Sequence, residues 1–176
     1  MKQKSIISRV SIDMFLEQMK WSLWFIVFVL VSYIVVIAIS INTGSNSSDF
    51  FGFSYGSTKV YMLVIGIISA SAFLTFYVKH GVTRKDYFIG SILAIIFLSI
   101  TLTLIPAVLV GVEYIIFDIS NLSQSDSFLN FNNNWFLLVN FINIFTYYLI
   151  GWLLGAGYYR FGWILGFGFI ALSIIF

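Results

Sequence analysis

Long runs of apolar residues without a single charge divide this chain, and they constrain its fold more than any other feature. An α-helix needs about 20 residues to cross the roughly 30 Å hydrocarbon core of a bilayer. Four runs reach that length and predict four transmembrane helices, and a fifth, shorter run predicts a further span. These spans cover about 21–41, 60–78, 87–112, 135–159 and 161–176. The fifth helix either stops within the membrane or, as we expect, continues past Phe176 in a longer chain.

Composition supports a chain whose solvent is largely lipid. Hydrophobic residues make up 60% of the 176 residues and charged residues only 9%, whereas soluble domains carry about 25% charged residues. This excludes a cytosolic globular enzyme, and the net charge of +2 gives no reason to expect a nucleic-acid partner. We therefore predict an all-α polytopic helical membrane protein, multi-pass in the cell membrane, with the lipid bilayer as its surroundings.

The distribution of Lys and Arg predicts the orientation of the spans. One side, formed by residues 1–20, 79–86 and the region of Arg160, carries all of these cations except Lys59. Because cytoplasmic loops of membrane proteins are enriched in Lys and Arg, this side and the N-terminus are predicted to be cytoplasmic. The segments 42–59 and 113–134, rich in Ser, Asn and Gly, are predicted to be loops at the outer face.

Residues 1–20 are predicted to form a cytoplasmic interfacial helix ahead of a single transmembrane domain over 21–176. Charged residues recur at helical spacing on one face, and apolar residues including Val10 and Met14 occupy another. Such a helix lies along a membrane surface. The alternatives are a simple anchor and a helix that also touches a partner.

No residue pattern in the sequence points to catalysis or to a cofactor. There is no cysteine, and His80 is the single histidine, so we expect no metal site and no catalytic residue. The ATP-binding Walker A pattern does not occur. No ionisable residue is expected inside a span, which argues against a transporter driven by an intramembrane ion relay.

The short basic segment between the second and third spans is the most informative one. Gly81 is expected to end the incoming helix with a positive φ, and Thr83 to cap the next helix with Asp86 three residues on. Arg84 and Lys85 then fall in a first turn, where the helix dipole disfavours cations. Either the orientation rule alone places them there, or an acidic partner surface docks on this turn.

The fourth span carries polar and small residues at helical spacing. Asn140, Asn143 and Tyr147 fall on one face, and Gly151 and Gly155 follow at the GxxxG spacing that lets helices approach closely. These residues are predicted to form a helix-packing face, within the chain or between two chains. The alternative is a permeation face.

Two stretches of the sequence resemble ABC-2-type transporter permeases. Gly81-Val82-Thr83-Arg84-Lys85-Asp86-Tyr87-Phe88-Ile89-Gly90 is similar to the loop between hairpin helices in Gram-positive members, and 151–162 is similar to the end of their fourth helix. The resemblance implies a membrane-spanning permease subunit of an exporter. By the same resemblance, a separate ATPase subunit would dock on the 79–87 loop, with Gly81, Val82, Thr83, Arg84, Lys85, Asp86 and Tyr87 as the coupling residues.

The family resemblance also implies partners. A second permease chain, either an identical copy or a paralogue, would complete the pathway, and ATP hydrolysis would occur in the ATPase chain. Members of the family usually have six spans, whereas this sequence shows five. The alternative function is a small non-transporting membrane protein, such as an immunity, sensor or scaffold subunit.

Overall fold

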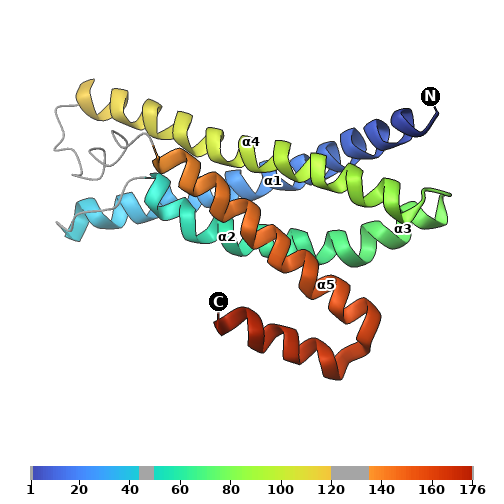
Figure 1. The fold of residues 1–176 in the computed structure, drawn as a ribbon. Helices are drawn as coiled ribbons and strands as arrows, with labels where there is room; N and C mark the ends of the chain where they lie inside the picture. Colours follow the sequence, from blue (N-terminus) through green and yellow to red (C-terminus); the bar gives the residue numbers. More distant parts are fainter. Residues whose placement is uncertain (1, 44–49, 120–134, 176) are drawn as a thin grey trace.

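The computed structural model describes residues 2–43, 50–119 and 135–175, with the backbone alone for 2–5, 41–43, 113–114, 116–119 and 159–175. All elements in these ranges are helical (Figure 1). Four helical segments are long and apolar enough to span a membrane, namely Ile6–Ser40, Phe50–Lys79, Arg84–Val112 and Phe136–Tyr158. The prediction of an all-α polytopic membrane protein with four spans is thus confirmed.

The N-terminal segment is continuous with the first span. Helix α1 runs from Lys2 to Thr43 without a break at residue 20, because this stretch contains neither proline nor glycine. Its first half packs along α4 (Arg84–Ile119): a Cβ on Gly90 would lie 2.9 Å from Val10 Cγ1. The structure therefore shows no separate interfacial helix, and the position of residues 1–20 relative to the lipid surface remains a prediction.

The second span begins about ten residues earlier than predicted. Helix α2 covers Phe50–Ile68, continues through a π-helical segment η1 at Ser69–Phe73, and ends as α3 at Leu74–Lys79. The prediction of a loop over the whole of 42–59 is therefore wrong for residues 50–59. The physical reason is an aromatic cluster, in which Phe50 and Phe51 are buried against Tyr33 of α1 and Val110 of α4.

The only proline does not end the third span. Pro106 lies inside α4, which continues as one helix to Ile119. Proline often kinks or ends a helix, but α4 does not end at Pro106. The predicted outer loop 113–134 therefore starts later than expected, and its part from 120 to 134 lies outside the described residues.

The fourth span belongs to helix α5, which extends from Phe136 to Ile175. In Figure 1 its C-terminal part turns back toward the remainder of the bundle. The predicted fifth span, 161–176, falls within this part, whose side chains lie outside the described ones. A fifth span accordingly remains a prediction.

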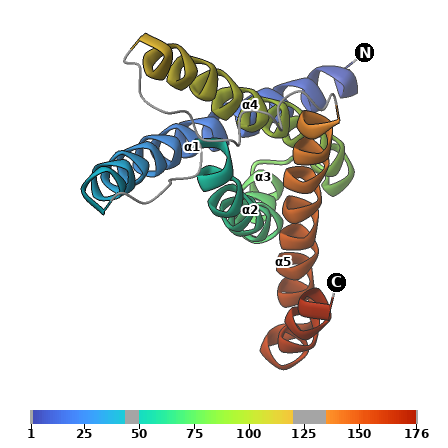
Figure 2. The ribbon, with the colours of Figure 1, turned by 90° about the vertical axis from the view of Figure 1, so that its left-hand side faces the viewer.

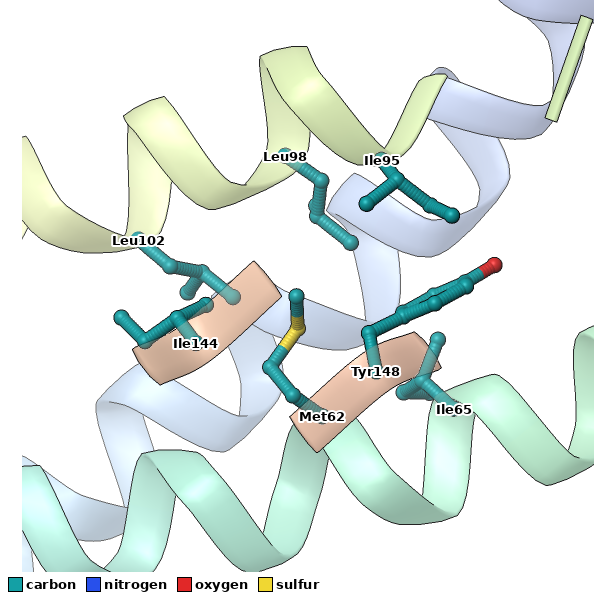
Figure 3. Close-up of a cluster of buried hydrophobic side chains, with 7 residues drawn as sticks. All are labelled: Met62, Ile65, Ile95, Leu98, Leu102, Ile144 and Tyr148. Atoms are coloured by element: carbon teal, nitrogen blue, oxygen red, sulfur yellow. The ribbon is translucent and has the colours of Figure 1, made fainter. Parts of the chain in front are cut away.

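The core joins three helices in the middle of the bundle. Met62 and Ile65 of α2 meet Ile95, Leu98 and Leu102 of α4 and Ile144 and Tyr148 of α5 (Figure 3). Helix α2 lies between α1 and α5 (Figure 2), and α1 packs most extensively on α4. This arrangement places the 80–83 turn and the N-terminal half of α1 at the same end of the molecule (Figure 1).

Candidate functional site

The turn between α3 and α4 is built by a Schellman motif. The Val82 amide donates to the Tyr77 carbonyl at 3.1 Å, and the Gly81 amide donates to the Val78 carbonyl at 3.1 Å. Gly81 has φ of 84°, the left-handed conformation that glycine adopts without strain. The predicted role of Gly81 in ending the helix is confirmed.

Thr83 caps the next helix, as predicted. The Asp86 amide donates to Thr83 Oγ1 at 3.1 Å, and Thr83 Oγ1 donates to Asp86 Oδ2 at 2.8 Å. The carboxylate of Asp86 is nearly fully buried and lies in the first turn of α4, where the helix dipole favours a negative charge. Val82 packs against the neighbouring apolar cluster of Val10, Met14, Tyr77, Tyr87 and Ala94. The turn is thus fixed by backbone, side-chain and apolar contacts.

The same turn presents its cations outward. Lys79, Arg84 and Lys85 are all exposed, whereas Asp86 and Tyr87 point inward and are buried. The positive charges are therefore displayed on a rigid support, where a partner surface with negative charge can reach them.

Tyr87 connects this turn to the π-helical segment of the second span. Its hydroxyl donates to the Ser69 carbonyl at 2.7 Å and lies 3.1 Å from Ser69 Oγ. The Ser69 carbonyl also accepts from the Leu74 amide, the i to i+5 bond typical of a π-helix. Short π-helical segments within longer helices frequently occur at functional sites. The predicted coupling residue Tyr87 therefore contacts an irregular part of the neighbouring span.

Hydrogen bonds between buried or partly buried polar groups also link α1 to α2 and α5. Gln18 Nε2 donates to the Tyr148 hydroxyl at 3.2 Å, and Ser22 Oγ lies 2.9 Å from the Tyr61 hydroxyl. Gln18 and Tyr148 are fully buried. Hydrogen bonds between transmembrane helices of this kind contribute about 0.6 kcal/mol on average.

The predicted packing glycines lie at the crossing of α2 and α5. A Cβ on Gly151 would clash with the Leu63 backbone, and one on Gly155 would lie 2.7 Å from the Ile67 carbonyl oxygen. Gly66 of α2, which we did not predict, meets the backbone of Tyr148 and Trp152. The spacing of Gly66 and Ala70, four residues apart, is the small-residue signal that would have identified it.

The predicted polar face of the fourth span is divided between two environments. Asn140 is 5% exposed, and its Oδ1 has no hydrogen-bond partner among the described residues. Asn143 is partly exposed and donates through Nδ2 to the Tyr55 hydroxyl at 3.0 Å. Tyr147 is also partly exposed and lies beside Lys59 of α2.

Lys59 is the residue that sequence reasoning misplaced. It was predicted in an outer loop, but it lies within α2 and within the candidate span Phe50–Lys79. The predicted absence of carboxylates and lysines from the hydrocarbon part of the spans stays a prediction, since the candidate spans are defined by length and composition. A group of aromatic residues precedes Lys59 in the sequence and was the signal that the helix begins earlier. These residues are Phe50, Phe51, Phe53 and Tyr55.

Within the described residues, no three His, Asp or Glu side chains come together as a metal site would require. Comparisons with protein-family models, curated proteins and solved structures found no match.

Proposed function

We propose that this chain is the membrane-spanning permease subunit of an ABC transporter, acting as an exporter. The observation that supports this proposal is the construction of the 79–87 turn. Arg84 and Lys85 are exposed on a support that is fixed by the Gly81 Schellman motif and the Thr83 cap. A turn that has to transmit a force needs this rigidity.

A force applied to this turn can be transmitted to the membrane domain through two sets of contacts. Tyr87 is hydrogen-bonded to Ser69 in the second span. Tyr87 and Val82 also pack in the cluster that contains Val10 and Met14 of α1. Closure of a partner ATPase would thus move α1, η1 and α4 together, and a second permease chain would supply the other wall of the pathway. Catalysis of ATP hydrolysis belongs to the partner in this proposal.

The test is recovery of an ATPase with the tagged full chain from native membranes. We expect an ABC-type ATPase to co-purify with the unmodified protein. Arg84→Glu combined with Lys85→Glu reverses the charge of the turn and should abolish co-purification. Arg9→Glu is the matched control, because Arg9 is also an exposed cation but lies on α1, outside the turn.

Two results would contradict the proposal. One is the absence of any ATPase from the unmodified preparation, which would favour the non-transporting alternative. The other is an ATPase that remains bound to the charge-reversed turn while both variants insert normally into the membrane.

A further inference from the structure

Lys59 lies within a helical segment long enough to span a membrane, where ionisable side chains are rare and mark functional sites. Lys59 lies nine residues after the first residue of α2, which corresponds to about 14 Å along the helix axis. Its side chain is partly exposed and faces α5. It is therefore neither a loop residue nor a fully enclosed one.

Aromatic rings hold the ammonium group of Lys59 in place. Its Nζ lies 3.7 Å from the centroid of the Tyr55 ring and 5.5 Å from that of Tyr147. The Tyr55 ring is fixed in turn, because its hydroxyl accepts a hydrogen bond from Asn143 Nδ2. Cation–π contacts attract the charge but do not neutralise it.

No carboxylate among the described side chains neutralises Lys59. The ion pair found among them joins Lys20 to Glu17 at 3.0 Å. The Tyr55 hydroxyl accepts a hydrogen bond from Asn143, and a tyrosine hydroxyl can also donate one through its own O–H. Ammonium and hydroxyl donors together match the oxygens of a phosphate group.

The surface around Lys59 shows which kind of anion can reach it. Gly56, three residues before Lys59, is exposed and has no atom within 4 Å of a built Cβ, so there is open space beside the lysine. The large exposed side chains that follow Gly56 on the same face of α2 are apolar: Val60 is 64% exposed and Val64 is 45% exposed. A ligand that suits this surface carries an anionic group together with hydrocarbon.

We propose that Lys59 and Tyr55 bind the phosphate of an anionic membrane phospholipid in the space beside Gly56. The acyl chains lie over Val60 and Val64, and Asn143 and Tyr147 hold the Tyr55 ring and the ammonium group in place. This binding site is independent of the transporter assignment, since it requires only the α2–α5 interface.

The test uses the full chain purified in mixed micelles of phosphatidylglycerol and phosphatidylcholine, with native mass spectrometry to count retained lipids. We expect about a fivefold preference for phosphatidylglycerol, the size expected for one basic residue near lipid phosphates. Lys59→Met should remove the preference, and Lys59→Arg should keep it. Gly56→Leu should also remove it by filling the space, without a clash in the fold.

Matched controls separate the site from general effects. Gly111→Leu places the same side chain at another helical glycine with open space on α4, and Lys79→Met removes an exposed cation at the other end of the same span. Both should bind lipid as the unmodified protein does. Circular dichroism checks that every variant keeps its helices.

Three results would overturn the proposal. The first is equal retention of the two lipids by the unmodified protein. The second is an undiminished preference in both Lys59→Met and Gly56→Leu. The third is displacement of phosphatidylglycerol by millimolar inorganic phosphate, which would assign the site to a soluble anion instead of a lipid.

Discussion

At the scale of single residues, five of the helical glycines fall into two groups that sequence spacing alone does not separate. Gly66, Gly151 and Gly155 lie where a Cβ would meet the backbone of the facing helix, whereas Gly56 and Gly111 face open space. Close contact between α2 and α5 depends on the first group. In the second group a side chain can be added without a clash, and glycine weakens its own helix.

We predict that Gly151→Ala destabilises the fold and that Gly111→Ala does not. The added methyl at Gly151 meets the Leu63 backbone, which has no flexible end to move aside. Overpacking of this type costs about 1–3 kcal/mol. In contrast, Gly111→Ala should stabilise its helix by about 0.5–1 kcal/mol. Unfolding in sodium dodecyl sulfate measures both, and equal stabilities would show that α2 and α5 are not in close contact.

Local chemistry made some residues of the candidate site predictable. Gly81 and Thr83 act through bonds to residues within five positions, so their roles follow from the sequence of the turn itself. The environments of Tyr87 and Lys59 depend on Ser69 and Tyr147, which are distant in sequence. No local pattern contains that information.

At the scale of elements, part of the predicted apolar face of residues 1–20 packs on protein. Val10 and Met14 are buried against α4, while the nearby Asp13 and Glu17 are exposed. An apolar stripe has the same spacing whether lipid or protein covers it. In the structure, protein covers the part of the stripe that contains Val10 and Met14.

Gly90→Leu tests whether α4 holds the first half of α1. The leucine side chain would occupy the position of the Val10 side chain and push α1 away. We expect faster hydrogen–deuterium exchange over residues 6–20, with the α2–α5 contact unaffected. Leu93→Ala is a suitable comparison, because Leu93 is an exposed residue of α4. Unchanged exchange in Gly90→Leu would show that α1 is held by other contacts.

At the scale of the whole molecule, the helices are longer than a bilayer is thick. Helix α1 has 42 residues and α4 has 36, which gives lengths of about 63 Å and 54 Å against a hydrocarbon core of about 30 Å. Hydropathy therefore predicted the four candidate spans of the described residues but not their ends. Residues 50–59 are helical because they pack on protein, which a search for apolar runs does not detect.

The absence of cysteine from the sequence makes the orientation directly testable. Lys85→Cys lies at the predicted cytoplasmic end, and Gly52→Cys lies near the opposite end of the bundle; both positions are exposed. In intact cells we expect a membrane-impermeant maleimide to label Gly52→Cys but not Lys85→Cys. Lys85→Cys should react only after permeabilisation, and the reverse pattern would invert the topology.

The bond between Tyr87 and the Ser69 carbonyl has a consequence for which substitutions this protein tolerates. The acceptor belongs to the backbone, so replacing Ser69 by alanine or glycine leaves the 2.7 Å contact in place. Replacing Tyr87 by phenylalanine removes the only donor of that contact. In a library randomised at both positions, functional variants should therefore accept several small residues at 69 but retain tyrosine at 87.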